Sequence, residues 1–403
     1  MPKGPRVAAP PKTVGTGANR TTSLSKENDT MMQRNLFAAA SALALAGALA
    51  LTPAHAADPD AALAAMKSQV FSTGPNGEKA SPASEVALTP DELAKVKAKH
   101  ATAALVFHYG GNDWSNAQEA ALKAQFAAEG VDVIAVTDAG FKPEKQVSDL
   151  ETVLAKKPDI IVSIPVDPVA TAAAYKAAAD KGVKLVFMDN VPKGFTAGKD
   201  YVSSVSADNY GNGVAAAHLM AKALKGKGQI GLVFHAADFF VTRQRYDGFK
   251  KTIEEQYPDI KIVAEQGIGG PDFSGDAEKA AGAILTEHPR INAIWAVWDV
   301  PAEGVMAAAR AAGREDLIVV NEDLGENVAI AMAKGEFIKG IASQRPYDQG
   351  VTEAKLAAYA LIGKPAPAYV ALPAAPITRD TLLESWKEIY HQPATDKILK
   401  SMK

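Results

Sequence analysis

The sequence predicts an α/β protein built from two doubly wound lobes, for three reasons. From Ala101 onward, short runs of β-branched residues alternate with Ala-rich amphipathic segments, as in parallel βαβ units. Runs such as Ile160–Val162 are apolar throughout, so helices must cover both faces of the sheet. The chain has 403 residues, which is enough for two or three domains of ordinary size.

Two sets of strands separated by helices are expected. In the first lobe we predict strands at Ala103–His108, Val131–Thr137, Asp159–Ile164 and Lys184–Asp189, with helices such as Asn116–Glu129 and Val169–Lys181 between them. Gly130 and Gly182 follow these helices and are suited to end them. In the second lobe we predict strands at Gln229–His235, Lys261–Gln266, Ala293–Trp298 and Leu317–Asn321, with helices that start near Asn212, Arg243, Gly275 and Pro301.

An export signal precedes the predicted lobes. Leu36–Leu51 is a nearly unbroken Ala and Leu run that follows Arg34 and ends in the small-x-small pattern of Ala54 and Ala56. We therefore expect cleavage after Ala56, with residues 1–30 an artefact of start-site assignment; an uncleaved anchor is the alternative. Residues 57–100 are interpreted as a leader, with one helix at Pro90–Lys99 capped by Thr89.

Composition excludes several classes of function. The chain has no cysteine, which rules out thiol nucleophiles, cysteine-based metal sites and a lipidated cysteine, and suits an oxidising compartment. The first 56 residues carry a net charge of +4, which leaves −7 for the rest of a chain whose total is −3. A nucleic acid partner is therefore not expected.

The sequence motifs of enzymes and of cofactor-binding proteins are either missing or in the wrong structural context. Gly226–Gly231 has the letters G-x-G-x-x-G, but it joins a helix to a strand, the reverse of a dinucleotide-binding turn. Phosphate-loop, nucleophile-elbow and H-E-x-x-H motifs are missing, and the seven histidines have no metal-ligand spacing, so no cofactor, metal or catalytic residue is predicted. His108 and His235 end the first strand of each lobe and could line a pocket, although a structural role is favoured.

Polar and aromatic residues collect where the predicted strands end. Ligands of wound sheets bind beside the carboxyl ends of the strands, and flat rings with Asp, Asn, Gln and Arg suit the faces and hydroxyls of a carbohydrate. The candidate ligand-binding residues at or near these ends are Asn112, Asp113, Trp114, Asp189, Asn190, Arg245, Trp298, Asp299 and Asp323.

Several segments, taken in order, carry a resemblance to a known family. They include Asn112–Trp114, Pro165–Pro168, Val186–Asp189, Ser206–Asn209, Arg243–Phe249, Val297–Asp299, Val319–Asp323 and Ala342–Gln344. From about Ala101 to Leu372 the chain resembles the ribose-binding-protein type of periplasmic solute-binding protein, which serves sugar ABC importers. That family has two Rossmann-like lobes joined by a three-crossing hinge, the type I periplasmic binding fold.

The resemblance implies boundaries and contacts. The crossings would lie near Ser204–Ala207, Ala342–Arg345 and Tyr369–Leu372, so that residues 101–204 with 345–370 form one lobe and 205–344 with 371–403 the other. The tail would add a helix at Leu382–Tyr390. Sugar-contacting positions of the family correspond to Asn112, Trp114, Asp189, Arg245, Asp323 and Gln344.

Departures from the family pattern bear on the ligand. Asn190 stands where an arginine is frequent, Trp298 where an asparagine is, and Glu322 and Ser115 where aromatic residues are. These exchanges make ribose itself doubtful.

The resulting expectation is a monomeric periplasmic receptor that clamps a neutral monosaccharide or sugar alcohol and delivers it to an ABC permease. A binder of an amino-bearing or signalling molecule that feeds a chemoreceptor is the alternative. Two other classes of protein fit less well. A repressor on the same lobes needs an N-terminal helix-turn-helix, which residues 57–100 lack. An exported enzyme needs a nucleophile with a base or a metal set, and neither is visible in the sequence.

Overall fold

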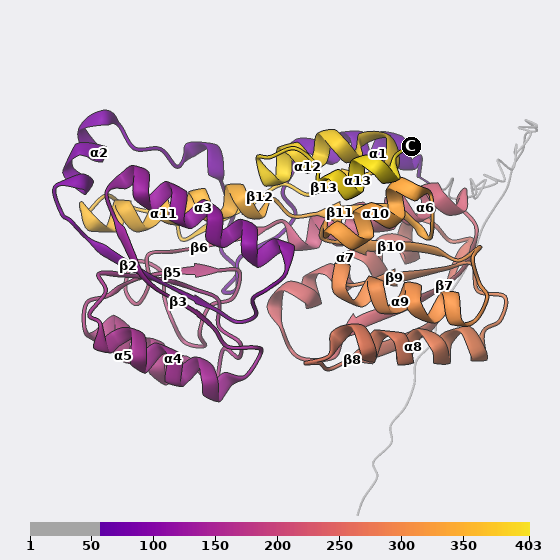
Figure 1. Cartoon of the computed structure of the whole chain (residues 1–403), viewed down its shortest axis with the longest axis horizontal. Coiled ribbons are helices and arrows are strands. Elements are labelled where there is room, and N and C mark those ends of the chain that lie inside the picture. Colours follow the sequence, from indigo (N-terminus) through magenta and orange to yellow (C-terminus); the bar gives the residue numbers. More distant parts are fainter. Residues whose placement is uncertain (1–56) are drawn as a thin grey trace, which may run out of the picture. The chain divides into compact units, whose positions relative to one another are not determined.

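The computed structural model describes residues 57–403, which contain two mostly parallel β-sheets, each covered by helices on both faces (Figure 1). The predicted export signal and its cleavage site lie outside these residues. We refer to the two sheets with their helices as the first and second lobes.

The first lobe holds seven parallel strands. In sheet order they are β1 (Ser81–Pro82), β12 (Tyr369–Leu372), β6 (Ser203–Ala207), β5 (Lys184–Met188), β4 (Ile160–Ser163), β2 (Thr102–Phe107) and β3 (Asp132–Asp138). Helices α3 (Asp113–Glu129) and α11 (Pro346–Leu361) pack on one face and α4 (Pro143–Ala155) and α5 (Ala172–Asp180) on the other. Both faces are therefore buried, as the apolar strands require.

The second lobe holds six strands, of which only β13 is antiparallel to its neighbour within the described residues. The order is β13 (Ala375–Ile377), β11 (Ile338–Ser343), β10 (Ile318–Glu322), β9 (Ala293–Ala296), β7 (Gly228–His235) and β8 (Ile260–Ile268). Helices α6 (Asn209–Leu224) and α7 (Phe240–Gln256) cover one face, and α8 (Phe273–Glu287), α9 (Asp299–Ala311) and α10 (Glu326–Lys334) the other.

Both ends of the described chain add further elements. At the amino end these are α1 (Pro59–Ala65), two 3₁₀ turns at Met66–Ser68 and Ala83–Glu85, and α2 (Pro90–Lys97). At the carboxyl end they are a 3₁₀ turn at Arg379–Thr381, α12 (Leu382–Tyr390) and α13 (Asp396–Ser401), which pack on the core of the second lobe through residues such as Trp386 and Ile398.

The predicted elements agree closely with the structure. All eight predicted strands are present, the tail helix has the predicted bounds, and Thr89 caps α2 in a reciprocal capping box. The helices of the second lobe begin two or three residues earlier than predicted, because Asp208 and Asp272 act as the N-caps of α6 and α8. The Gly226–Gly231 segment does join α6 to β7.

The lobe boundaries lie slightly later than the predicted residues 204 and 370. Strand β6 pairs within the first sheet through Ala207, and β12 does so through Leu372. The chain therefore passes between lobes after Ala207, near Gln344 and after Leu372. The leader, 57–100, was predicted to hold one helix, but it also contributes α1 and strand β1.

Candidate functional site

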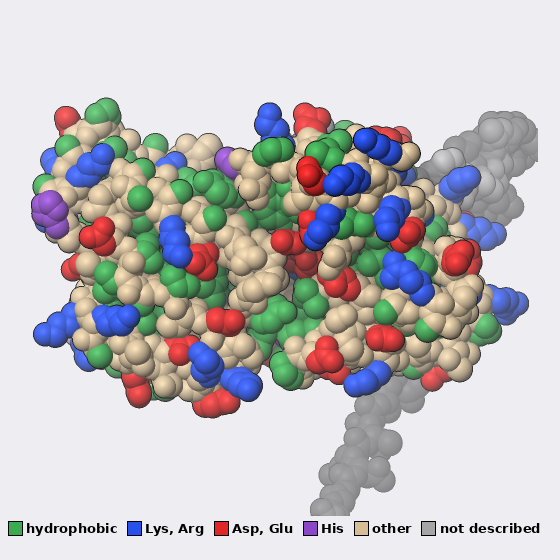
Figure 2. All heavy atoms as spheres, viewed as in Figure 1, with side chains coloured by type: hydrophobic (Ala, Val, Ile, Leu, Met, Phe, Trp, Pro, Cys, Tyr) green, Lys and Arg blue, Asp and Glu red, His purple; other side chains and the backbone are tan. Residues whose placement is uncertain are grey.

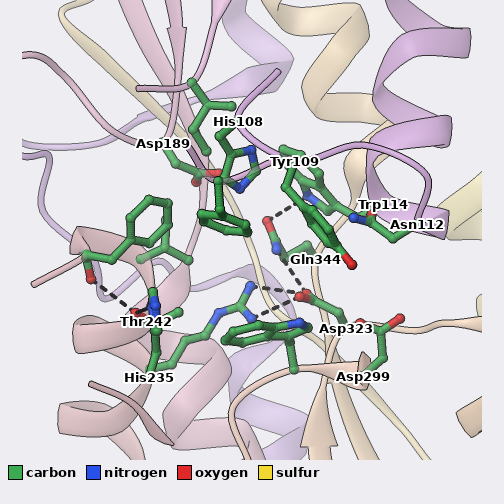
Figure 3. A pocket seen from close by; sticks show the side chains of 16 residues that line it. His108, Tyr109, Asn112, Trp114, Asp189, His235, Thr242, Asp299, Asp323 and Gln344 are labelled. Carbon is green, nitrogen blue, oxygen red and sulfur yellow. Dashed lines mark hydrogen bonds and ion pairs between the residues drawn. The ribbon is translucent and has the colours of Figure 1, made fainter. Parts of the chain in front are cut away.

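A pocket lies where the carboxyl ends of strands from both sheets face each other (Figure 3). On the face shown in Figure 2, acidic side chains gather near this junction. The residues that line the pocket are His108, Tyr109, Asn112, Trp114, Phe141, Ile164, Asp189, His235, Phe239, Val241, Thr242, Arg245, Trp298, Asp299, Asp323 and Gln344.

Eight of the ten predicted ligand-binding residues line this pocket. They are Asn112, Trp114, Asp189, Arg245, Trp298, Asp299, Asp323 and Gln344. The segments that carry them come from two sheets and lie up to 232 residues apart in the sequence, between positions 112 and 344.

Asp113 lies outside the pocket lining, contrary to its predicted place. It is the first residue of α3, so its side chain points about 100° away from that of Trp114 around the helix axis. Its Oδ2 instead accepts a hydrogen bond of 2.7 Å from the backbone N–H of Glu326, the first residue of α10. Asp113 thus joins the two lobes at a helix N-terminus, where a carboxylate is favoured.

Asn190 also lies outside the pocket lining. Asp189 has a left-handed backbone with φ of 54°, which turns the following residue into the first lobe. The Asn190 side chain is fully buried, and its amide donates to the carbonyl of Pro165 at 3.2 Å.

The structure adds eight pocket residues to the predicted set. They are His108, Tyr109, Phe141, Ile164, His235, Phe239, Val241 and Thr242. Phe239 immediately precedes α7, whereas Tyr109 and Phe141 occupy loops after β2 and β3 that the periodicity does not place. Phe141 has a φ of 58° and packs on Phe273 of the second lobe, with ring centroids 5.1 Å apart.

The two strand-end histidines line the pocket, as the sequence allowed, and both pack against neighbouring side chains, as a structural role requires. His235 Nδ1 lies 3.2 Å from the Thr242 hydroxyl, and the His108 ring stacks on Phe239 at 5.8 Å. Burial lowers the pKa of His108 to about 3 and that of His235 to about 4. Both rings are therefore neutral near pH 7 and offer one donor and one acceptor each.

One aspartate of each lobe stands in the left-handed region at the edge of the pocket. Asp189 follows β5 and Asp323 follows β10, with φ of 54° and 63°. Asp tolerates this conformation better than most residues, but the backbone is still strained, and strained residues are frequent at functional sites. The turn directs each side chain across the end of its own sheet.

Arg245 is the one cation among the residues that line the pocket, and it is almost fully engaged. Its two terminal nitrogens bind the Asp323 carboxylate at 2.9 and 3.1 Å, and its Nε lies 3.1 Å from Glu322. The side chain is 2% exposed. Such a buried, bidentate pair fixes the guanidinium and leaves little of its charge for a ligand.

Hydrogen bonds connect the polar side chains into a path that we call the pocket network. Arg245 donates to Asn209 at 3.2 Å, and Asn209 donates to Asp189 at 3.3 Å. On the other side Gln344 donates to Asp323 at 2.9 Å and accepts from Trp114 at 3.3 Å. The network therefore runs, in order, through Asp189, Asn209, Arg245, Asp323, Gln344 and Trp114.

Asp189 offers an acceptor to the pocket. Ser206 and Asn209 both donate to its Oδ1, and Oδ2 has no donor within residues 57–403. Burial raises the pKa of this carboxyl to about 6, against the opposing effects of Ser206 and Arg245. Asp189 is therefore ionised at neutral pH.

Asp299 stands among other carboxylates. Burial, followed by the nearby Asp323 and Asp113, raises its pKa well above the usual range. None of the ion pairs formed by residues 57–403 includes Asp299, so the pocket has a surplus of acidic groups.

The space enclosed by the lining residues suits a small molecule. It amounts to about 570 Å³ with the open mouth included. Aromatic rings, carboxylates and amides around such a space bind a polyhydroxylated ligand by replacing its water.

Two observations concern other kinds of site. His, Asp and Glu side chains within 57–403 form no group of three or more that could hold a metal ion. None of the helices in the same residues is both long and apolar enough to cross a membrane.

Two sheet-based lobes with a polar and aromatic pocket at their facing strand ends define a two-lobed binding protein for small molecules. A family model described as "Periplasmic binding protein domain" matches residues 103–365. The chain belongs to this family of periplasmic binding proteins and is not an enzyme.

Curated relatives agree with this assignment. The D-ribose/D-allose-binding protein of Pseudomonas aeruginosa is 30% identical over 223 residues, which are 54% of this chain and 68% of the relative. The D-apiose import binding protein of Actinobacillus succinogenes is 30% identical over 207 residues, or 51% and 64% of the two chains.

Solved structures share the fold over most of their length. An ABC transporter solute binding protein from Agrobacterium vitis with bound allitol is 25% identical with a TM-score of 0.63, covering 71% of this chain and 98% of the other. An ABC sugar transporter subunit from Rhodobacter sphaeroides is 28% identical with a TM-score of 0.61, covering 70% and 98%. The two-lobed type I periplasmic binding fold is thus confirmed.

Proposed function

We propose that this protein is the substrate-binding component of an ABC importer and that it binds a neutral monosaccharide or sugar alcohol between its lobes. The observation that carries the proposal is the pocket network, because it presents acceptors and donors side by side between two tryptophans. Two of its relatives are named for D-ribose, D-allose or D-apiose, and a similar structure holds allitol.

Specificity would come from the cost of unpaired groups. A bound hydroxyl donates to Asp189 Oδ2, whereas an analogue that lacks this hydroxyl leaves that buried acceptor without a partner. Each unpaired group weakens ligand binding by about 1–3 kcal/mol.

A thermal-shift panel tests the proposal. Purified residues 57–403 would be heated with D-ribose, D-allose, D-apiose, allitol and further pentoses, hexoses and polyols. A ligand present at 100 times its Kd stabilises the fold by about 2.7 kcal/mol, which is several degrees for a protein of this size. If no neutral sugar or polyol shifts the transition, the proposed ligand class is wrong.

An amino-bearing ligand is the second candidate, and the surroundings of Asp299 favour it. Asp299 has carboxylate neighbours, and Arg245 is already paired with Asp323 and Glu322. An ammonium group would neutralise part of this surplus and could lie against the face of Trp298. Such a molecule could equally serve as a signal for a chemoreceptor.

Calorimetry with a neutral sugar, its amino derivative and its acid derivative separates the candidates. We expect the acid to bind weakest, because the lining residues, all within 57–403, offer its anion no unpaired cation. Tighter binding of the amino derivative than of its neutral parent would favour the second candidate. Tight binding of the acid beside an inert neutral parent would contradict both.

Affinity for a neutral sugar is expected to fall below pH 6. A proton on Asp189 competes with the ligand hydroxyl, and the raised pKa of about 6 places this competition between pH 5 and 7. At pH 5 the affinity should be about tenfold lower than at pH 7.5. His108 and His235 titrate at lower pH and do not contribute.

Calorimetry at the two pH values checks this dependence. Asp189→Asn should bind more weakly and show a smaller pH dependence, because its amide does not titrate, whereas Asp299, whose pKa is also raised, stays in the pocket. Equal affinity of the parent protein at pH 5 and 7.5 would show that Asp189 does not accept from the ligand.

The family places the protein in the periplasm. We further propose that it is exported by a signal peptide cleaved after Ala56, is not lipid-anchored, acts as a monomer and binds no nucleic acid. N-terminal sequencing of the exported protein is expected to read from Ala57. A periplasmic form that retains Leu36–Leu51 would contradict the export argument.

A further inference from the structure

Residues 57–100, which precede the family match at 103, begin on the second lobe. Helix α1 packs on α6, and its Leu63 is buried in the core of that lobe together with Met66. Asp60 forms a 2.6 Å ion pair with Lys222 of α6. The start of this segment is therefore a packed part of the second lobe (Figure 1).

The segment then binds residues at the first crossing of the chain between the lobes, which follows Ala207. Asp208 follows β6 and is fully buried. Its Oδ2 accepts from the Phe71 N–H at 2.9 Å, and its Oδ1 accepts from the Ser72 N–H at 2.8 Å and the Ser72 hydroxyl at 2.7 Å. The Ser72 oxygen in turn accepts from the Tyr210 N–H at 2.9 Å.

Beyond Ser72 the segment moves to the first lobe. The Thr73 carbonyl still accepts from Gln244 of α7, whereas Glu78 accepts from the Tyr201 hydroxyl at 3.3 Å. Strand β1 then pairs with β12 at the edge of the first sheet. Helix α2 follows, and the Tyr359 hydroxyl of α11 binds the backbone of Ala87 at 2.8 Å.

Gly74 lies where the segment crosses from the second lobe to the first. It is also close to β12, after which the chain crosses between the lobes again. A Cβ added here would stand 2.9 Å from the ring of Tyr369, the first residue of β12. Residues 71–74 thus contact both the chain that leaves β6 and the chain of β12.

We propose that residues 57–100 form a fourth connection between the lobes, anchored where Ser72 and Phe71 bind Asp208, and that this connection limits how far the lobes separate. Rotation of one lobe about the other passages would pull Phe71 and Ser72 away from a buried carboxylate. Hydrogen bonds to charged groups are among the stronger ones, and a buried acceptor left without them is costly. Asp208 is a positioning residue in this arrangement and does not touch the pocket.

Asp208→Asn tests the anchor with a matched control. Asparagine caps a helix as well as aspartate does, so α6 keeps its N-cap, but the amide nitrogen cannot accept from Phe71. Asp272→Asn is the control, because Asp272 caps α8 through Gly275 just as Asp208 caps α6 through Gly211, and it does not bind residues 57–100.

The readout is the distance between the lobes in the ligand-free protein, which makes the test independent of the ligand's identity. Since the chain has no cysteine, Glu151→Cys on α4 and Lys279→Cys on α8, both at exposed positions, give two specific sites for spin labels. We expect Asp208→Asn to broaden the distance distribution toward longer values and Asp272→Asn to leave it unchanged. Identical distributions in all three proteins would overturn the proposal.

Ser72→Ala gives a second, milder variant in case Asp208→Asn folds poorly. It removes the hydroxyl shared by Asp208 and Tyr210 but leaves the α6 cap intact. Hydrogen exchange should show at least about tenfold less protection at the amides of Phe71, Ser72 and Tyr210, with α8 unchanged. Unchanged protection at these amides would likewise contradict the proposed anchor.

Discussion

Arg245→Met is expected to lower the free energy of unfolding by about 3–5 kcal/mol and to abolish ligand binding. Within residues 57–403, the substitution removes the one cation that pairs with Asp323 and Glu322, at 2.9–3.1 Å, and Glu322 is fully buried. Breaking a buried ion pair from one side leaves an uncompensated charge, and losses of this size follow. Urea unfolding and calorimetry with the sugar selected by the thermal-shift panel measure the two effects.

Arg243→Met is the matched control two residues earlier on α7. Arg243 pairs with Asp238, and both side chains are more than half exposed. Its substitution should therefore lower the free energy of unfolding by less than about 1 kcal/mol. If both substitutions lower the free energy of unfolding by the same amount, the ion pairs of Arg245 do not stabilise the pocket.

Trp114→Ala and Trp298→Ala are each expected to weaken ligand binding by at least about tenfold, or about 1.4 kcal/mol. The two residues line the pocket from opposite lobes, Trp114 on α3 and Trp298 immediately before α9. Stacking on a sugar or polyol buries a large flat surface that alanine cannot replace. Ligand should also change the intrinsic fluorescence of the parent protein.

The other tryptophans make this test selective. Trp295 and Trp386 are buried in the two cores of the second lobe, so the fluorescence change should survive Trp386→Phe. Trp114→Phe keeps an aromatic face but loses the hydrogen bond to Gln344, which should give an intermediate affinity. Parent affinity in both alanine variants would show that the rings do not contact the ligand.

The strands and most of the polar pocket could be predicted from the sequence because both depend on local signals. A run such as Ile160–Val162 is apolar over its whole length, and Asp189 and Asp323 directly follow such runs. In a parallel sheet the carboxyl ends lie at one edge, so strand-end residues come together without further information.

The placements that the sequence did not predict depend on geometry finer than the strand pattern. Asp113 and Trp114 are neighbours in sequence, but the first turn of α3 separates their directions, and only the structure shows that Asp113 meets Glu326. Asn190 turns inward because Asp189 is left-handed. Phe141 reaches the pocket from a turn whose shape its residue types do not specify.

The fourth connection could not be predicted because residues 57–100 are rich in Ala, Pro, Ser and Lys and lack a strong period. Strand β1 has two residues, too few for an alternating pattern. Its partner is nearly 290 residues away at Val370. Contacts between residues so far apart in the sequence become visible only in the structure.

The pocket network has a consequence for how analogues of the ligand would behave. Its members come from both lobes and from the chain between them, since Asn209 follows the first passage and Gln344 lies in the second. Substitutions that share hydrogen-bond partners are not additive in free energy. Under the proposed function, ligand binding and closure of the lobes are therefore coupled, so a sugar that fails to satisfy Asp189 would also weaken the closed state that the transporter recognises. Discrimination between sugars would therefore appear as a difference in delivery as well as in affinity.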